Sequence, residues 1–231
     1  MIGGIDFSNL GAAVLELLQR LVIVLIALTF HEVAHGWAAK KLGDSTAHDR
    51  GRLSLNPLHH LDPIGFLCMV LFRFGWAKPV PINVRNFKNP KLGMALCGLA
   101  GPVANLPLAF VILLPFEIIA ALLNGGIWLP QSEFAVNLIT VTIEFIRNFH
   151  FMNITLAIFN FIPVPPLDGS RVLWSVLPDR LYFGVMRYER YISMALMLVL
   201  VLGWLDLPLT IAASALSKGM QWIWELLPFF G

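Results

Sequence analysis

The sequence contains few charged residues. Asp, Glu, Lys and Arg make up 13% of its 231 residues, whereas average domains carry roughly 25%. The net charge is +2, and no basic stripe interleaved with aromatics is present, so nucleic acid is not an expected partner. Cys68 and Cys97 lie far apart in apolar surroundings without a Cys-x-x-Cys motif, which argues against a disulfide or a cysteine metal site.

Hydrophobic residues are abundant instead. They make up 58% of the chain, and the mean hydropathy is +0.75. A helix needs about 20 predominantly apolar residues to cross the hydrocarbon core of a bilayer. The composition therefore predicts an all-α polytopic membrane protein with about four to six transmembrane or re-entrant helices, for which the lipid bilayer is a partner.

Four apolar stretches are expected to cross the membrane within a single domain over residues 1–231. They are residues 10–40, 92–123, 134–162 and 191–215. The segments between them are more polar or are broken by proline and glycine.

Residues 42–91 are expected to form a cytoplasmic and partly re-entrant region, with 64–76 inserted and an extended or hairpin segment at 76–86. Residues 163–170 interrupt the helical pattern with prolines and a glycine and are expected to form a loop. The tryptophan-rich segment 216–231 is expected to lie at the membrane interface.

Lys and Arg residues are distributed unevenly along the chain. Residues 40–91 hold nine of the sixteen, residues 171–190 hold four, and residues 124–133 hold none. Because cytoplasmic loops carry an excess of these residues, we expect 40–91 and 171–190 in the cytoplasm and 124–133 outside. The expected location is the plasma or inner membrane.

The sequence HEVAH, residues 31–35, follows the apolar run LVIVLIALTF. Residues i and i+4 share one face of a helix, so His31 and His35 can present two imidazoles to one metal ion. Glu32 is offset by about 100° and can reach a metal-bound water without being a ligand. A match this short also arises by chance, but ionisable groups at membrane depth are costly and usually functional. The pattern therefore predicts a zinc-protease type of site.

A catalytic zinc site needs a third protein ligand and an open fourth position. Asp168 is expected at the same depth as HEVAH, in the loop at 163–170, where irregular backbone is tolerated if it lines a cavity or packs in protein. Asp206 is expected toward the outer side, and His59 and His60 in a solvated loop. The full set of candidates by residue type is His48, Asp49, His59, His60, Asp62, His150, Asp168 and Asp206.

Three motifs occur in one order along the chain: HEVAH, then GLAGPVAN at 98–105, then FNFIPVPPLDG at 159–169. In this order and spacing, over about residues 20–180, the chain resembles the site-2 proteases, a family of intramembrane zinc metalloproteases. It resembles the small prokaryotic-type members that carry no PDZ or CBS domain. The resemblance implies one Zn²⁺ per chain, held by His31, His35 and Asp168, with Glu32 as the general base.

The same resemblance assigns roles to two amides. Asn105 and Asn160 would bind the substrate or stabilise the reaction intermediate. For Asn105 a packing hydrogen bond between helices is an equally good interpretation.

These observations predict a zinc-dependent endopeptidase that cuts peptide bonds within or near transmembrane segments of membrane proteins, as in regulated intramembrane proteolysis. An unwound substrate strand could pair with the extended segment 76–86. One alternative is a metal-ion transporter or channel that uses the HEVAH histidines as a transport site. Another is a non-catalytic scaffold, whose structural zinc site would be closed by four protein ligands. No particular oligomer is predicted.

Overall fold

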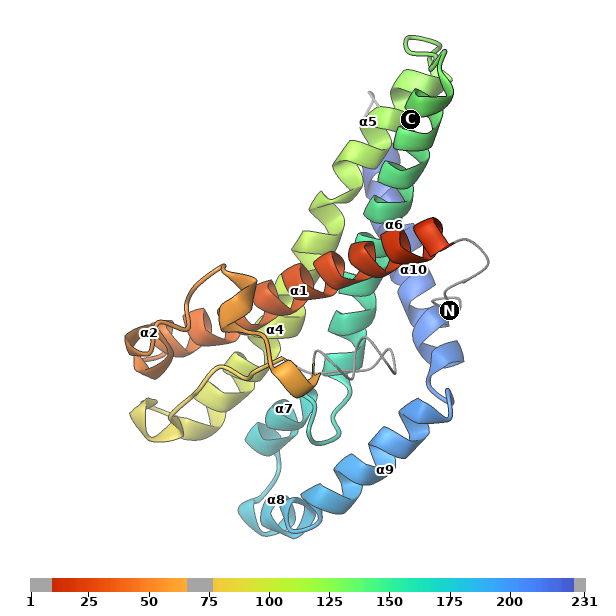
Figure 1. Ribbon diagram of the computed structural model, residues 1–231. Helices are drawn as coiled ribbons and strands as arrows, with labels where there is room; N and C mark the ends of the chain where they lie inside the picture. Colours follow the sequence, from red (N-terminus) through yellow and green to blue (C-terminus); the bar gives the residue numbers. More distant parts are fainter. Residues whose placement is uncertain (1–9, 66–76, 227–231) are drawn as a thin grey trace.

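The computed structural model describes residues 10–65 and 77–226, and these residues form an assembly of helices (Figure 1). Within them there is no strand, and Leu61 and Ala77 form an isolated antiparallel bridge. The all-α prediction is confirmed. In chain order the helices are α1 (Leu10–Lys41), α2 (Thr46–Asp49), η1 (Pro57–His59), η2 (Val84–Asn86), α4 (Pro90–Val111), α5 (Leu113–Asn124), α6 (Glu133–Phe161), α7 (Gly169–Val176), α8 (Asp179–Met186), α9 (Glu189–Val201) and α10 (Asp206–Glu225), where η marks a 3-10 helix.

Two helical segments in the described part of the chain are long and apolar enough to cross a membrane, Leu10–Lys41 and Pro90–Asn124. The α9–α10 pair would add a third if its two helices, bent by 79°, count as one span. In the most apolar 18-residue stretch of each of the first two segments, only 22% and 17% of the stretch is buried inside the protein. Because most of their apolar side chains point outward, lipid is the surrounding that keeps them from water. The protein is an all-α membrane protein.

Among the described residues there are two candidate spans, or three with the bent pair, whereas the sequence predicts about four to six transmembrane or re-entrant helices. α6 is 29 residues long, but Glu144, Arg147 and His150 interrupt its apolar sequence, and it is not among the candidate spans. The single helix expected over 191–215 is instead two helices. Gly203 has a φ of 70°, which suits a glycine that ends a helix, and it separates α9 from α10.

Other expected boundaries also shift. The stretch 92–123 is divided into α4 and α5 at Ile112. Pro115 explains this break, because it has no N–H to donate to the carbonyl of Val111 four residues earlier. The segment 216–231 begins inside α10 and ends outside the described residues. The re-entrant segment expected at 64–76 lies almost entirely outside them.

α4 is the centre of the fold. It packs against α1, α6 and α7, and α1 crosses it in Figure 1. Many of the residues that α4 buries are small, among them Gly93, Ala95, Gly98, Gly101 and Ala109. Small residues let membrane helices approach closely, which increases van der Waals contact between them. α4 thus brings the second half of α1 next to the loop between α6 and α7.

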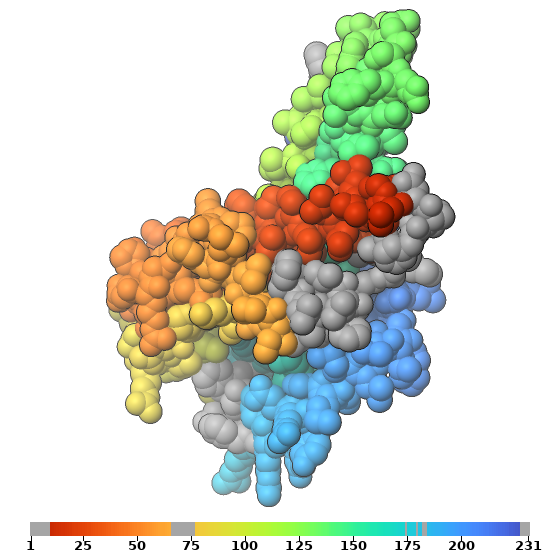
Figure 2. Space-filling view, in the orientation of Figure 1, coloured from red at the N-terminus to blue at the C-terminus, as the bar shows by residue number. Residues whose placement is uncertain are grey.

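The far ends of α5 and α6 project beyond the rest of the molecule (Figures 1 and 2). Ile127, Leu129 and Phe134 are exposed at this tip. Nearer the centre, α10 packs against α4, α5 and α6 through Ala213 and Met220. The tip therefore lies away from the residues of the predicted metal site.

Candidate metal centre

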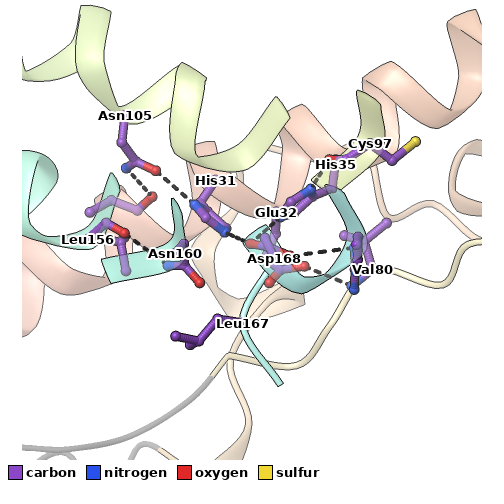
Figure 3. Close-up of polar contacts among 12 residues, drawn as sticks. His31, Glu32, His35, Val80, Cys97, Asn105, Leu156, Asn160, Leu167 and Asp168 are labelled. Atoms are coloured by element: carbon purple, nitrogen blue, oxygen red, sulfur yellow. Dashed lines mark hydrogen bonds and ion pairs between the residues drawn. The ribbon is translucent and has the colours of Figure 1, made fainter. Parts of the chain in front are cut away.

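His31 and His35 lie one turn apart on α1 and direct their Nε2 atoms at one carboxylate oxygen. Nε2 of His31 is 2.9 Å and Nε2 of His35 is 3.1 Å from Oδ2 of Asp168 (Figure 3). The two rings meet edge to face, with their centroids 4.6 Å apart. All three side chains are buried. The helical spacing of HEVAH thus supplies two sides of a site, and a residue 133 positions after His35 supplies the third.

Asp168 is positioned by the tight turn that starts α7. A β-carbon on Gly169 would lie 2.5 Å from the carbonyl oxygen of Phe161, so a larger residue would push the loop away from α6. The backbone N–H of Arg171 donates to the carbonyl of Asp168 at 2.9 Å. The Arg171 guanidinium also lies 3.5 Å from Oδ1 of Asp168. Oδ1 therefore faces a cation while Oδ2 faces the histidines.

The donor set fits zinc. One ligand atom from each of His31, His35 and Asp168 lies within 4.8 Å of the others. Nitrogen and oxygen ligands at roughly 2.0–2.2 Å from a tetrahedral zinc are themselves about 3.3 Å apart, so each Nε2 needs to separate from Oδ2 of Asp168 by only a few tenths of an ångström. Three protein ligands leave a fourth position open, as in catalytic zinc sites. Among the described residues, no other three His, Cys, Asp or Glu side chains converge in this way.

Two of the other third-ligand candidates take part in different contacts. Nε2 of His60 lies 2.7 Å from the carbonyl of Ser54. His150 lies between α4 and α10, where Nδ1 contacts the carbonyl of Ala109 and Nε2 contacts Ser217, each at 2.8 Å. Neither belongs to the group that could hold a metal.

The second nitrogen of each imidazole contacts α4. Nδ1 of His35 is 2.6 Å from the carbonyl oxygen of Cys97. That oxygen can only accept, so Nδ1 carries the proton and Nε2 keeps its lone pair for a metal. Nδ1 of His31 is 2.8 Å from Oδ1 of Asn105. Such outer contacts fix the orientation of metal-binding histidines.

Two glycines of the GLAGPVAN motif lie directly against the site. A β-carbon on Gly101 would lie 2.6 Å from Cε1 and Nε2 of His31, and closer still to Nε2 of His35. A β-carbon on Gly98 would lie 2.8 Å from the carbonyl oxygen of Asp168. Glycines at i and i+3 therefore form the face of α4 on which the three predicted ligands rest.

Glu32 is tied to the extended segment 77–83. Its Oε2 accepts a hydrogen bond from the N–H of Val80 at 2.8 Å (Figure 3). The expected strand edge at 76–86 differs in detail, because Val84 begins η2 and residue 76 lies outside the described residues. Pro79 and Pro81 have no N–H, and Val80 gives its own to Glu32. The segment therefore offers few free donors to a substrate strand.

The same segment is anchored at both ends. The N–H of Lys78 donates to the carbonyl of His60 at 2.8 Å. The N–H of Asn83 donates to Oδ2 of Asp44 at 2.7 Å, and Nδ2 of Asn86 donates to Oδ1 at 2.7 Å. Burial would raise the pKa of Asp44, but hydrogen bonds, including those from Thr46, outweigh it and hold the pKa below its ordinary value. Asp44 thus fixes the segment that contacts Glu32.

Comparison with known proteins agrees with this geometry. The chain is 39% identical over 178 residues to YwhC of Bacillus subtilis (strain 168), which is provisionally named a zinc metalloprotease. The match covers 77% of this chain and 78% of YwhC. The chain belongs to the site-2 protease family.

More distant relatives are also provisionally named zinc metalloproteases. Rip2 of Mycobacterium tuberculosis (strain H37Rv) is 26% identical over 153 residues, which cover 64% of this chain and 53% of Rip2. MJ0611 of Methanocaldococcus jannaschii is 28% identical over 171 residues, which cover 72% of this chain and 75% of MJ0611. No family model matches the chain, and no solved structure matches it.

The site-2 protease resemblance assigns substrate-binding roles to Asn105 and Asn160, and these roles stay predictions. Asn105 is fully buried, and its Nδ2 donates to Asn153 Oδ1 at 2.7 Å and to the Ala27 carbonyl at 3.2 Å. Nδ2 of Asn160, which is half-buried, donates to the carbonyl of Leu156 in its own helix at 3.0 Å. The contacts of Asn105 are those of a hydrogen bond between helices, the alternative interpretation.

Sequence reasoning missed several residues that the structure places at or next to the site. They are Asp44, Asn153 and Arg171. Asn153 carried a usable signal, because a polar amide seven residues before Asn160 lies on the same face of an apolar helix, where unpaired polar groups are costly. Asp44 and Arg171 carried none, since a charged residue next to a turn is ordinary.

Proposed function

We propose that this protein is a zinc-dependent endopeptidase that hydrolyses peptide bonds within or near transmembrane segments of membrane proteins. One observation carries the proposal. Three buried side chains that could hold a metal, His31, His35 and Asp168, converge beside Glu32. Both histidines and Glu32 lie in the second half of a helix long and apolar enough to span a bilayer. A site placed this way can act on a peptide that is itself embedded in the membrane.

The residues divide the work as follows. His31, His35 and Asp168 would hold one Zn²⁺ per chain, which supplies a Lewis acid that activates water. Glu32 is held at Oε2 by Val80, and its Oε1 would accept a proton from the attacking water and deliver it to the leaving amine. The Arg171 guanidinium lies 3.5 Å from Oδ1 of Asp168, the oxygen turned away from the histidines. Gly98 and Gly101 leave room for the ligands.

The proposed setting is the plasma or inner membrane, with the site near the cytoplasmic side. The excess of Lys and Arg in residues 40–91 and 171–190 supports this orientation. Both regions adjoin the site, because 40–91 follows α1 and 171–190 follows Asp168. The partners would be the lipid bilayer and a transmembrane protein or peptide, and the reaction would serve regulated intramembrane proteolysis.

The test pairs zinc content with peptide cleavage. Purified protein in lipid would be given a fluorogenic transmembrane peptide, and bound zinc would be measured in the same samples. Wild type should cut the peptide. Glu32→Gln should bind zinc and be inert, and Asp168→Ala should lose zinc. Glu144→Gln and Asp206→Ala are matched controls, because both residues lie outside the metal group, and these variants should behave like wild type.

Three results would contradict the proposal. Loss of zinc in Asp206→Ala but not in Asp168→Ala would show that the third ligand is misassigned. Full cleavage by Glu32→Gln would remove the proposed base. Zinc flux into sealed vesicles without cleavage of any transmembrane peptide would favour the transporter.

A further inference from the structure

The two metal-facing histidines are oriented by groups of different character. His35 donates to the carbonyl of Cys97, a backbone oxygen that cannot change its role. His31 contacts the side-chain amide of Asn105, whose two ends are an acceptor and a donor. If that amide were reversed, its NH₂ would face Nδ1 and favour the tautomer with the proton on Nε2, the atom needed by the metal. Something must therefore hold Asn105 in one orientation.

Asn153 on α6 supplies that constraint. Its Nδ2 donates to the carbonyl of Phe149 at 2.9 Å, which turns its Oδ1 toward α4. Oδ1 can only accept, so the atom of Asn105 that faces it at 2.7 Å must be Nδ2. The carbonyl of Ala27 also accepts a hydrogen bond from this Nδ2, at 3.2 Å, and so favours the same orientation of the Asn105 amide. Oδ1 of Asn105 is left to accept from Nδ1 of His31.

Burial makes this chain of hydrogen bonds decisive. Asn105 and Asn153 are both 0% exposed. No solvent competes for their amide groups, and an unpaired end would carry the full penalty of a buried polar group. The direction set at Phe149 is thus transmitted through two amides, from α6 through α4 to α1.

We propose that Asn153 is a positioning residue that fixes the zinc-binding tautomer of His31 through Asn105. This inference deepens the proposed function and rests on its zinc site. Removing Asn153 leaves only the longer contact with the carbonyl of Ala27 to hold Asn105, so the reversed amide becomes accessible and the competent form of His31 would be only partly populated. Loss of partners that orient metal ligands typically lowers metal affinity about 10- to 100-fold.

The test measures zinc affinity by competition with a chelator, in the full chain and without any substrate. Asn153→Ala should raise the dissociation constant about 10- to 100-fold. Asn153→Asp in its protonated form keeps one acceptor and one donor and should stay near the wild-type value. Asn137→Leu, at an exposed amide on the same helix, is the matched control. The Co²⁺-substituted proteins should show an altered ligand-field spectrum for Asn153→Ala but not for Asn153→Asp or Asn137→Leu.

A double-mutant cycle separates positioning from general packing. If Asn153 acts through Asn105, the pair Asn105→Ala/Asn153→Ala should lose no more affinity than Asn105→Ala alone. Additive losses, or wild-type affinity and spectrum in Asn153→Ala, would overturn the inference while leaving the protease proposal intact. A wild-type protein that binds no zinc would overturn both. If Asn153→Ala fails to fold, Asn153→Leu takes its place. Wild-type zinc affinity in Asn153→Leu would overturn the inference, and a loss of zinc affinity in Asn153→Leu that Asn153→Asp does not share would support it.

Discussion

Replacing Gly101 with alanine should abolish tight zinc binding without unfolding the protein. The added β-carbon would lie 2.6 Å from two atoms of His31 and closer still to Nε2 of His35, whereas real β-carbons essentially never approach within 3.0 Å. The His31 ring must therefore move by at least 0.4 Å, and by 0.8 Å to reach ordinary contact at 3.4 Å, and the His35 ring must move further. Ligand distances in a metal site are held within about 0.2 Å, so either movement exceeds what the site tolerates.

The imidazoles have little freedom to escape this methyl group. Nδ1 of His31 contacts Asn105, and Nδ1 of His35 contacts the carbonyl of Cys97. Both partners lie on α4, the helix that carries Gly101, so moving the rings away from position 101 breaks these bonds. We expect zinc affinity to fall by at least about 100-fold, the upper end of losses seen when the surroundings of a metal ligand are disturbed.

The protein itself should remain folded. Overpacking costs roughly 1–3 kcal/mol, and alanine regains about 1 kcal/mol over glycine in a helix. Zinc affinity by chelator competition and thermal unfolding of the metal-free protein separate the two effects. Gly219→Ala on α10 is the matched control, since its β-carbon would meet no atom within 4 Å. Wild-type zinc affinity in Gly101→Ala would refute the reasoning, because the metal would then not lie against this glycine.

Three further predictions concern the residues around the ligands. Val80→Pro removes the N–H that holds Glu32 and should lower kcat by about 10-fold or more with zinc content unchanged. Val80→Ala keeps the N–H and should retain the wild-type kcat, so equal kcat values for the two variants would contradict the role of Val80 in positioning Glu32. Arg171→Ala should weaken zinc binding less than about 10-fold in chelator competition, because its guanidinium is 3.5 Å from Asp168 and partly exposed. Asp44→Ala should lower the free energy of unfolding by about 1–3 kcal/mol in denaturant titrations near neutral pH. Because folding lowers the pKa of Asp44, the extra stability of wild type over Asp44→Ala should be fully present above the ordinary carboxylate pKa and should disappear as the pH falls through the lowered pKa. A stability difference that persists at the lowest pH would contradict the hydrogen-bonding role of Asp44.

The sequence alone indicated the parts of the site that depend on local geometry. HEVAH on a helix must place two histidines on one face, because the helical period is fixed. Long apolar runs at 10–40 and 92–123 indicated membrane helices, because the length of a span follows from the thickness of a bilayer. The prolines and glycine around Asp168 indicated a loop, since they remove backbone donors or relax backbone limits.

Boundaries and helix counts were less predictable. The break between α9 and α10 depends on a left-handed glycine, Gly203, whose conformation the apolar pattern around it does not reveal. α6 has the length of a span, but its charged residues remove it from the candidates. In both cases the hydrophobic pattern indicates that a segment is apolar, but it does not show where a helix breaks or whether the helix spans the membrane.

Only the tertiary structure decided which distant groups meet. It brings Asp168, the candidate that the sequence already favoured, against His31 and His35, because α4 holds α1 and α7 close together at Gly98 and Gly101. It joined Val80 to Glu32 and Asn153 to Asn105 across 48 residues in each case. Such contacts depend on the packing of whole helices, and no local period or spacing contains that information. The sequence by itself determined the chemistry available on α1, and the packing around α4 determined which groups complete it.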